Sequence, residues 1–203
     1  MKKLSFAAIS LIMMFLVSCG SSTIKLDQPD TVSVLKEQVF KAVSPDARIV
    51  SINLMPPNDY LSTEVYMMTI EYLSDDDKVR NAIVYLGAGI DTKDEEKKSQ
   101  PRDMAGYMKE KGRSIKDYDF SMIFENVSNA AKQVIDSGAK YSGVGSYKVE
   151  FAADPGKDKH SFCIRSGAGT SVSGRNLVTE YYEHDAKAGS DGVVTVEIVE
   201  VDE

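Results

Sequence analysis

Two cysteines and two histidines are the side chains of this 203-residue chain whose types are best suited to nucleophilic or metal chemistry. A thiolate can attack an electrophile or bind a metal, and an imidazole can act as a base or a ligand. His160 and Cys163 are three residues apart, which places them on opposite faces of a strand. We therefore expect no shared metal ion, and we expect Cys163 to be a small buried core residue.

Serine chemistry and calcium binding also lack their usual patterns. His160 and His184 both lie in strand-like stretches near charged residues, so we expect both at the surface, and no G-x-S-x-G motif occurs. Residues 75–77 are three consecutive aspartates without the alternation or the distal glutamate of an EF-hand, which predicts a solvated hairpin tip. The sequence therefore predicts neither a catalytic set nor a metal site or cofactor.

Three glycine-rich stretches are candidates for ligand loops: LGAGI, SGVGS and SGAGTSVSGR. None of them has the G-x-G-x-x-G spacing of a dinucleotide site, and the third has arginine where a P-loop needs lysine. Glycines at strand ends and bulges explain all three stretches. The alternative for the third is a loop whose hydroxyls and exposed amides bind an anion or a sugar. Its ligand-binding residues would be Gly167, Gly169, Ser171, Ser173 and Arg175.

The first 18 residues have the order of a secretory signal peptide. Lys2 and Lys3 precede an apolar stretch from Leu4 to Val17, and small residues follow. The stretch is shorter than the roughly 20 residues that cross a bilayer as a helix, which favours a cleaved leader over a retained helical anchor.

The end of this leader, Leu16-Val17-Ser18-Cys19, resembles the lipobox of bacterial lipoproteins. The resemblance implies that Cys19 carries a diacylglycerol, that the leader is cut before it, and that the new amino terminus is acylated. Two or more acyl chains hold a protein stably at a membrane, whereas one chain does not.

The residues after Cys19 bear on the destination. Gly20 replaces the aspartate that retains enterobacterial lipoproteins in the inner membrane, and the acidic cluster typical of surface-exported Bacteroidetes lipoproteins is missing. The resemblance therefore implies the outer membrane, facing the periplasm, with the cell surface as the alternative.

The net charge and the number of cysteines limit the kinds of partner that the protein is expected to bind. Without the two leader lysines the chain has 22 basic and 31 acidic residues, a net charge of −9. Such a surface argues against nucleic acid and against flat docking on anionic lipid. With Cys19 committed to lipid, Cys163 has no partner for a disulfide.

Apolar periodicity predicts the elements of the fold. Helices are expected over 31–43 and 121–137, where apolar residues recur at three and four, with Gly138 ending the second. Residues 88–119 are a charged linker or loop, with a short helix over 104–111. Extended stretches are expected over 48–55, 60–73, 79–86, 143–152, 160–166, 176–184 and 193–201.

A helix followed by three strands and a helix followed by four predict an α+β fold, an antiparallel sheet packed by two helices. The order is compatible with a tandem repeat or with one domain containing a seven-stranded sheet. Its outline is similar to the tandem modules of secreted PepSY-like and β-lactamase-inhibitor-like proteins. The expected division is 1–18 signal peptide, 19–30 lipidated tether, 31–87 first module, 88–119 linker and 120–203 second module.

These patterns favour a membrane-anchored envelope lipoprotein that binds an envelope protein or a small ligand without catalysis. One alternative is a periplasmic hydrolase, because 31 acidic residues leave room for paired carboxylates. The other is a secreted inhibitor or assembly factor.

Overall fold

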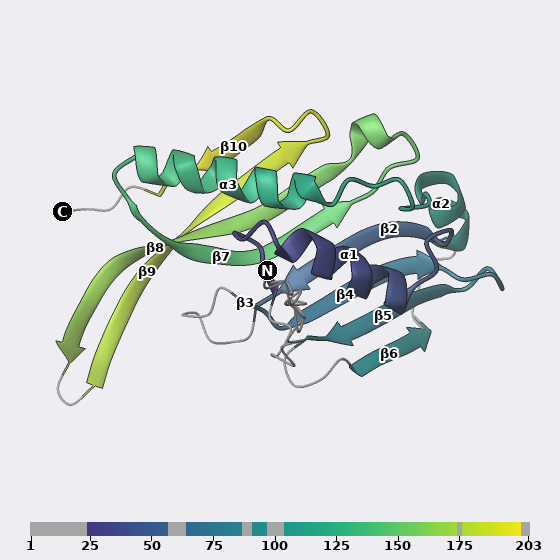
Figure 1. The fold of residues 1–203 in the computed structure, drawn as a ribbon, viewed down its shortest axis with the longest axis horizontal. Helices are drawn as coiled ribbons and strands as arrows, with labels where there is room; N and C mark the ends of the chain where they lie inside the picture. Colours follow the sequence, from purple (N-terminus) through teal and green to yellow (C-terminus); the bar gives the residue numbers. More distant parts are fainter. Residues whose placement is uncertain (1–23, 57–63, 87–90, 97–103, 174–175, 200–203) are drawn as a thin grey trace, which may run out of the picture.

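The computed structural model describes residues 24–56, 64–86, 91–96, 104–173 and 176–199. Its main element is an antiparallel sheet of eight strands in the order β10-β9-β8-β7-β2-β4-β5-β6 (Figure 1). Helices pack on this sheet, so the predicted α+β class is confirmed.

The chain builds the sheet from two similar halves that meet at its centre. Each half is a helix followed by four strands of the large sheet, and β2 pairs with β7 with Ser51 opposite Glu150 and Leu54 opposite Tyr147. The strand order is therefore mirrored about the β2–β7 pair. The first half contains α1 (Thr31–Ala42), β2 (Arg48–Met55), β4 (Met67–Leu73), β5 (Val79–Tyr85) and β6 (Asp91–Glu96). The second contains α3 (Ser121–Asp136), β7 (Lys140–Glu150), the 3-10 turn η1 (Pro155–Lys157), β8 (Lys159–Ser173), β9 (Asn176–Gly189) and β10 (Val194–Glu197).

The segment expected to be a charged linker contributes to both sides of this architecture. Its residues Asp91–Glu96 form β6, which pairs with β5 at the edge of the sheet and completes the first set of four strands. Charged side chains suit an edge strand, because they discourage pairing with other chains. The short helix predicted in this segment is α2 (Met104–Lys111), and Ile115 and Tyr118 beyond it are buried. The linker interpretation is therefore corrected for these residues.

The fold also begins earlier than the expected tether allows. Ile24–Lys25 form β1, which pairs with β3 (Glu64–Val65) in a separate two-stranded sheet. Ile24 and Leu26 are completely or almost completely buried. The Thr31 hydroxyl donates to the Lys25 carbonyl at 2.6 Å, which fixes this segment against the start of α1. Residues from Ile24 onward therefore belong to the folded body.

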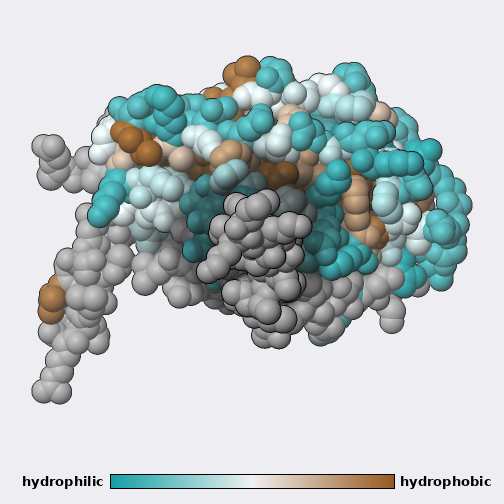
Figure 2. All heavy atoms as spheres, in the orientation of Figure 1, coloured by the Kyte–Doolittle hydropathy of each residue, from teal (hydrophilic) through white to brown (hydrophobic). Residues whose placement is uncertain are grey.

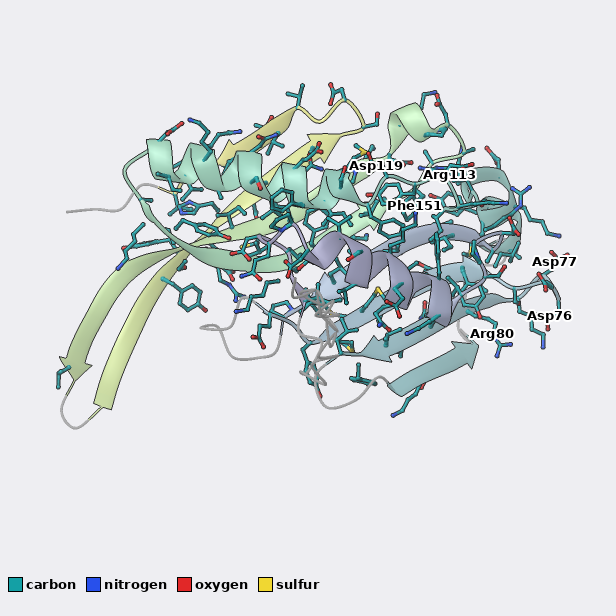
Figure 3. All side chains as sticks on the ribbon, in the orientation of Figure 1. Asp76, Asp77, Arg80, Arg113, Asp119 and Phe151 are labelled. Atoms are coloured by element: carbon teal, nitrogen blue, oxygen red, sulfur yellow. The ribbon has the colours of Figure 1, made fainter. Side chains whose placement is uncertain are left out.

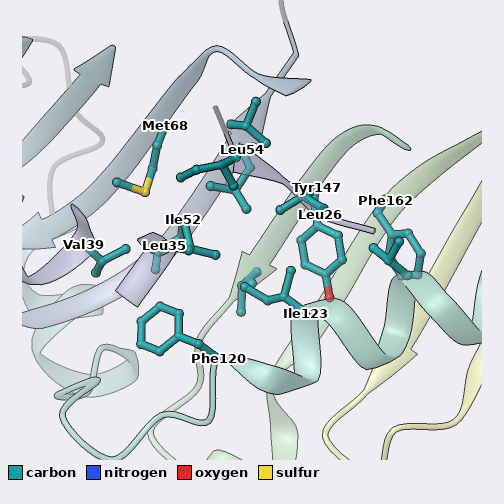
Figure 4. Packing of buried hydrophobic residues seen from close by; sticks show 14 of the residues in the cluster. Leu26, Leu35, Val39, Ile52, Leu54, Met68, Phe120, Ile123, Tyr147 and Phe162 are labelled. Atoms are coloured by element: carbon teal, nitrogen blue, oxygen red, sulfur yellow. The ribbon is translucent and has the colours of Figure 1, made fainter. Parts of the chain in front are cut away.

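One hydrophobic core joins the two halves. Helices α1 and α3 pack on the same side of the sheet, which we call the helix face, and contribute Leu35, Val39 and Ile123 to the core (Figure 4). Tyr147 of β7 faces them, as its period-2 pattern predicts. Burial of one such large side chain contributes roughly 1.5–3 kcal/mol.

Helix α3 ends as its sequence predicts. Gly138 has a positive φ of 91°, and its N–H donates to the Ile135 carbonyl at 2.9 Å. The N–H of Ala139 donates to the Val134 carbonyl at 3.3 Å. This pair of bonds is a Schellman motif, in which a glycine adopts the left-handed conformation at little cost.

Helix α2 packs on the other side of the sheet. Met108 contacts a small separate cluster that includes Leu73 and Val79. By strand alternation, these two side chains point away from Ile70 and Ala82, which face the main core. We call this second side the open face, because α2 covers only its β2–β4–β5 end among the described residues.

Candidate functional site

The open face carries a shallow groove of about 450 Å³ across the second half of the sheet. It spans four neighbouring strands, β2, β7, β8 and β9. We call it the sheet groove. The side chains that line it on the open face are Asn53, Met55, Ser146, Lys148, Ser161, Cys163, Asp185 and Lys187. By contrast, the visible surface over α3 is largely hydrophilic (Figure 2).

Strand register aligns four polar residues across the groove. Asn53 lies opposite Lys148, Lys148 opposite Ser161, and Ser161 opposite Lys187. Neighbouring strands are about 4.8 Å apart, so the two lysines start from positions roughly 10 Å apart with a hydroxyl between them. This row offers two cations and uncharged hydrogen-bond donors to one ligand.

The lysines of this row have only weak partners within the protein. Lys148 bonds to Glu150, and the Lys187 Nζ lies 3.7 Å from a Glu197 carboxylate oxygen. All four side chains are between 43% and 73% exposed, and ion pairs at such exposure contribute about 0–1 kcal/mol. An incoming carboxylate or phosphate can therefore replace either glutamate at small cost.

Cys163 is part of the groove floor rather than a nucleophile. Its side chain is nearly buried, and this burial raises the pKa of the thiol to about 12, with the charges of Glu183 and Asp185 adding to the effect. A reactive cysteine needs a lowered pKa, so this thiol stays protonated at neutral pH. The prediction that Cys163 is buried, on the face opposite His160, is confirmed.

Close strand packing at this point explains one of the glycine-rich stretches. A Cβ on Gly145 would lie 3.2 Å from the Cys163 Cβ and 3.3 Å from its Sγ. The register of β7 with β8 also shifts on either side of Val144. Glycine at a bulge, as predicted for this stretch, lets β7 approach β8 here.

A serine–histidine pair exists on the helix face, but its geometry is wrong for catalysis. Ser166 Oγ and His184 Nε2 are 2.8 Å apart, and both residues are buried. His184 Nδ1 accepts the backbone N–H of Val199 at 3.0 Å. The ring proton must therefore reside on Nε2, from which it donates to Ser166. A general base would have to accept the serine proton, so this pair is structural and holds the segment after β10.

The second histidine is also buried. Asn126 donates to the Tyr147 hydroxyl at 3.1 Å, which leaves that hydroxyl to donate to His160 Nδ1 at 2.8 Å. The ring proton then lies on Nε2, which has no hydrogen-bond partner among the described residues. Burial lowers the pKa of His160, with the charge of Asp158 opposing it, and burial also lowers the pKa of His184.

The expectation of surface histidines is therefore wrong. His184 alternates with Ala186 and Ala188, and all three face the core. If polar residues had also been allowed at inward positions, the period-2 alternation would have predicted that His184 faces the core. His160 can be buried because the Tyr147 hydroxyl, which itself accepts from Asn126, satisfies its Nδ1 in the core.

A buried ion pair fixes the segment between α2 and α3. Arg113 bonds to Asp158, and its guanidinium lies 5.2 Å from the centre of the Phe151 ring (Figure 3). Asp158 also accepts the Ala152 N–H at 2.9 Å, and Arg113 forms a backbone bridge with Ile49. Among the described residues, Asp158 is the one acidic residue that is buried, and its partner is the cation of Arg113 rather than a second acid. This arrangement gives no support to paired carboxylates.

The glycine-rich stretch for which a ligand loop was the alternative interpretation is a strand in its described part. Gly167, Gly169, Ser171 and Ser173 lie in β8, and the register shift between Gly167 and Gly169 is a bulge of the predicted kind. We call the paired segments Gly169–Ser173 and Asn176–Glu180 the β8–β9 ribbon. The loop interpretation is thus corrected for these residues. Arg175, and the glycines Gly87 and Gly89 of LGAGI, lie outside the described residues.

The three aspartates form a hairpin tip, as predicted. The Ser74 hydroxyl donates to Asp76 at 2.5 Å, and Lys109 of α2 pairs with Asp77 at 2.5 Å. The part of the chain that the structure describes contains no group of three histidine, cysteine or acidic side chains suited to a metal ion. Its helices are all too short or too polar to cross a bilayer.

Comparison with protein-family models, with curated proteins and with solved structures gives no match. The sheet groove therefore has to be interpreted from its own chemistry: two weakly paired lysines, a central hydroxyl, an amide and one carboxylate on a rigid sheet.

Proposed function

We propose that the chain is a bacterial envelope lipoprotein, held at the outer membrane by lipid on Cys19, whose domain binds a ligand without catalysis. The lipobox residues Leu16 to Cys19 support the anchor. The arrangement of the buried histidines supports a non-catalytic role, because His184 donates to its serine and His160 is tied to Tyr147.

The row of Lys148, Ser161 and Lys187 carries the binding proposal. Two ammonium groups on either side of a hydroxyl suit a carboxylate or phosphate group of a polar ligand. Asp185, directly beside the row, can accept from a donor elsewhere on the same ligand. A partner protein presenting an acidic side chain or a small anionic molecule would both meet this description.

The anchor is tested with Cys19→Ala. We expect the variant to lose incorporation of labelled palmitate and to leave the membrane fraction, while Cys163→Ala keeps both. A Cys19→Ala protein that remains entirely with the membranes would contradict lipid anchoring.

The groove is tested by photo-crosslinking in native envelopes. A photoreactive residue replaces Ser161 in the groove or, as the matched control, the exposed Ser128 of α3 on the helix face. We expect an adduct from position 161 only, reduced several-fold by Lys148→Gln together with Lys187→Gln. Equal adducts from both positions, or an adduct indifferent to the lysines, would refute the proposed site.

A further inference from the structure

The first described residue, Ile24, and the β8–β9 ribbon lie at the same end of the sheet. Tyr66 next to β3 donates its N–H to the Met55 carbonyl at the end of β2, and β3 pairs with β1. Ile24 is therefore close to this end. Strand β8 starts opposite Glu150 and reaches Gly167 opposite Lys140, so it leaves the sheet beyond the Met55 end as well.

A direct contact links the ribbon base to the first folded residues. The Tyr141 hydroxyl donates to an Asp27 carboxylate oxygen at 2.9 Å. Tyr141 lies opposite Ser166 on β8, just before the ribbon begins, and Asp27 is three residues after Ile24. Burial and the charge of Asp27 raise the pKa of Tyr141, so the hydroxyl remains a donor at neutral pH.

Chain length then limits how far the ribbon base is from the lipid. Ile24 is buried, and the chain can extend by at most about 3.5 Å per residue, or roughly 18 Å between Cys19 and Ile24. If Cys19 is acylated, the bilayer surface lies within this reach of the β1–β3 sheet. The hairpin tip with Asp76 and Asp77 lies at the opposite end of the molecule (Figure 3).

The ribbon differs chemically from the rest of the chain. From residue 166 to residue 180 the sequence contains two charged residues, Arg175 and Glu180, whereas 27% of the whole chain is charged. Val172 is 74% exposed. The pairing of β8 with β7 ends at Gly167, and that of β9 with β10 ends at Asp185, so the ribbon strands pair only with each other among the described residues (Figure 1).

Such a ribbon needs a neighbouring surface. A two-stranded hairpin alone is marginally stable in water, and exposed edges are normally protected by charged side chains, of which the two ribbon segments contain only Glu180. A lipid headgroup region meets both needs, because it accepts an exposed valine and also supplies water and polar groups to the unpaired edges. The hydrocarbon interior does not, since unpaired backbone groups are costly there.

We infer that the β8–β9 ribbon is a second membrane contact, lying in the headgroup region of the bilayer that holds Cys19. This inference rests on the proposed lipid anchor. The ribbon fixes the orientation of the domain, with the β1–β3 end toward the membrane and the Asp76 hairpin tip away from it. In this orientation the acidic rest of the domain stays away from the anionic membrane surface, while the ribbon, which has few charges, contacts it.

The test uses the full lipidated protein in vesicles of phosphatidylethanolamine and phosphatidylglycerol, in a Cys163→Ser background. An environment-sensitive fluorophore is attached through Val172→Cys or, as the matched control, through Asp76→Cys. We expect lipids carrying a headgroup quencher to quench the label at position 172 at least three-fold more than the label at position 76. Hydrogen exchange of the unlabelled protein is the second measurement, and the ribbon amides should be several-fold slower in vesicles than in detergent.

The outcomes separate the two proposals. If mass spectrometry shows no acyl groups on the protein and the protein does not bind the vesicles, the lipid anchor is refuted. Protein that is acylated and bound, but shows equal quenching at both positions and unchanged ribbon exchange, refutes the membrane contact alone. Protection of the ribbon that requires an added envelope protein, without lipid quenching, would assign the ribbon to strand pairing with that protein and overturn the inference.

Discussion

The buried histidines predict that the protein loses stability in mild acid. His160 and His184 are both neutral in the fold, and burial lowers both pKa values below the ordinary 6.5. As pH falls below about 6.5, the unfolded chain therefore takes up protons that the folded chain does not. The free energy of unfolding must decrease over this window and level off once the folded-state pKa is passed.

The magnitude follows from the number of protons involved. Each histidine contributes at most about 1.4 kcal/mol per pH unit between 6.5 and its folded pKa, so the two together contribute up to about 2.7 kcal/mol per unit. Protonation of His184 would place an N–H on Nδ1 against the Val199 N–H that now donates to it at 3.0 Å. Protonation of His160 would likewise place a proton on its Nδ1, to which the Tyr147 hydroxyl now donates at 2.8 Å.

Urea unfolding at a series of pH values between 7.5 and 5 measures this slope directly. His184→Asn keeps an acceptor for the Val199 N–H and removes one titrating ring, so we expect it to reduce the slope by up to half. Carboxylates titrate mainly below this window and contribute the same background to both proteins. Equal stability at pH 7.5 and 5.5, or a slope that His184→Asn leaves unchanged, would refute the assignment of neutral buried histidines.

Three substitutions test the packing of strands β7 and β8. Tyr147→Phe should lower the free energy of unfolding by roughly 2–6 kcal/mol, because it leaves the Asn126 amide and His160 Nδ1 without their shared hydroxyl at about 1–3 kcal/mol each. A urea midpoint within error of the parent would contradict this network. Gly145→Ala should cost about 1–3 kcal/mol by overpacking against β8, whereas Gly167→Ala, which meets no atom within 4 Å, should be nearly neutral in the same assay. Equal effects of the two alanines would show that strand approach at Gly145 is not what requires glycine.

Local pattern predicted the elements that bury one face. The three- and four-residue spacing of α3 and the alternation of Tyr147 with its neighbours both correspond to side chains in the core. The same reasoning missed β6, because an edge strand of charged residues carries no apolar period. It also misplaced His184, because only apolar residue types were counted as inward-facing.

The sheet groove could not be found by such reasoning. Asn53, Lys148, Ser161 and Lys187 become neighbours only through the pairing of four strands, two of which are joined by the central β2–β7 contact. That contact unites segments almost a hundred residues apart in the sequence. Register at this range depends on which faces are buried, so it follows from the assembled sheet and not from any single stretch.

The two halves of the sheet differ in how their open face is covered. This difference leaves the proposed binding groove accessible. In the first half the segment that joins the two halves folds back as α2 and packs Met108 on Leu73 and Val79. In the second half the corresponding side of β7, β8 and β9 presents Lys148, Ser161 and Lys187 with no helix over them among the described residues. Stability explains apolar residues under α2, but it does not explain two lysines held in one row beside a hydroxyl, since their exposed ion pairs contribute little. The proposed recognition of an anionic group would account for the row, and it requires only that this half of the sheet remain uncovered.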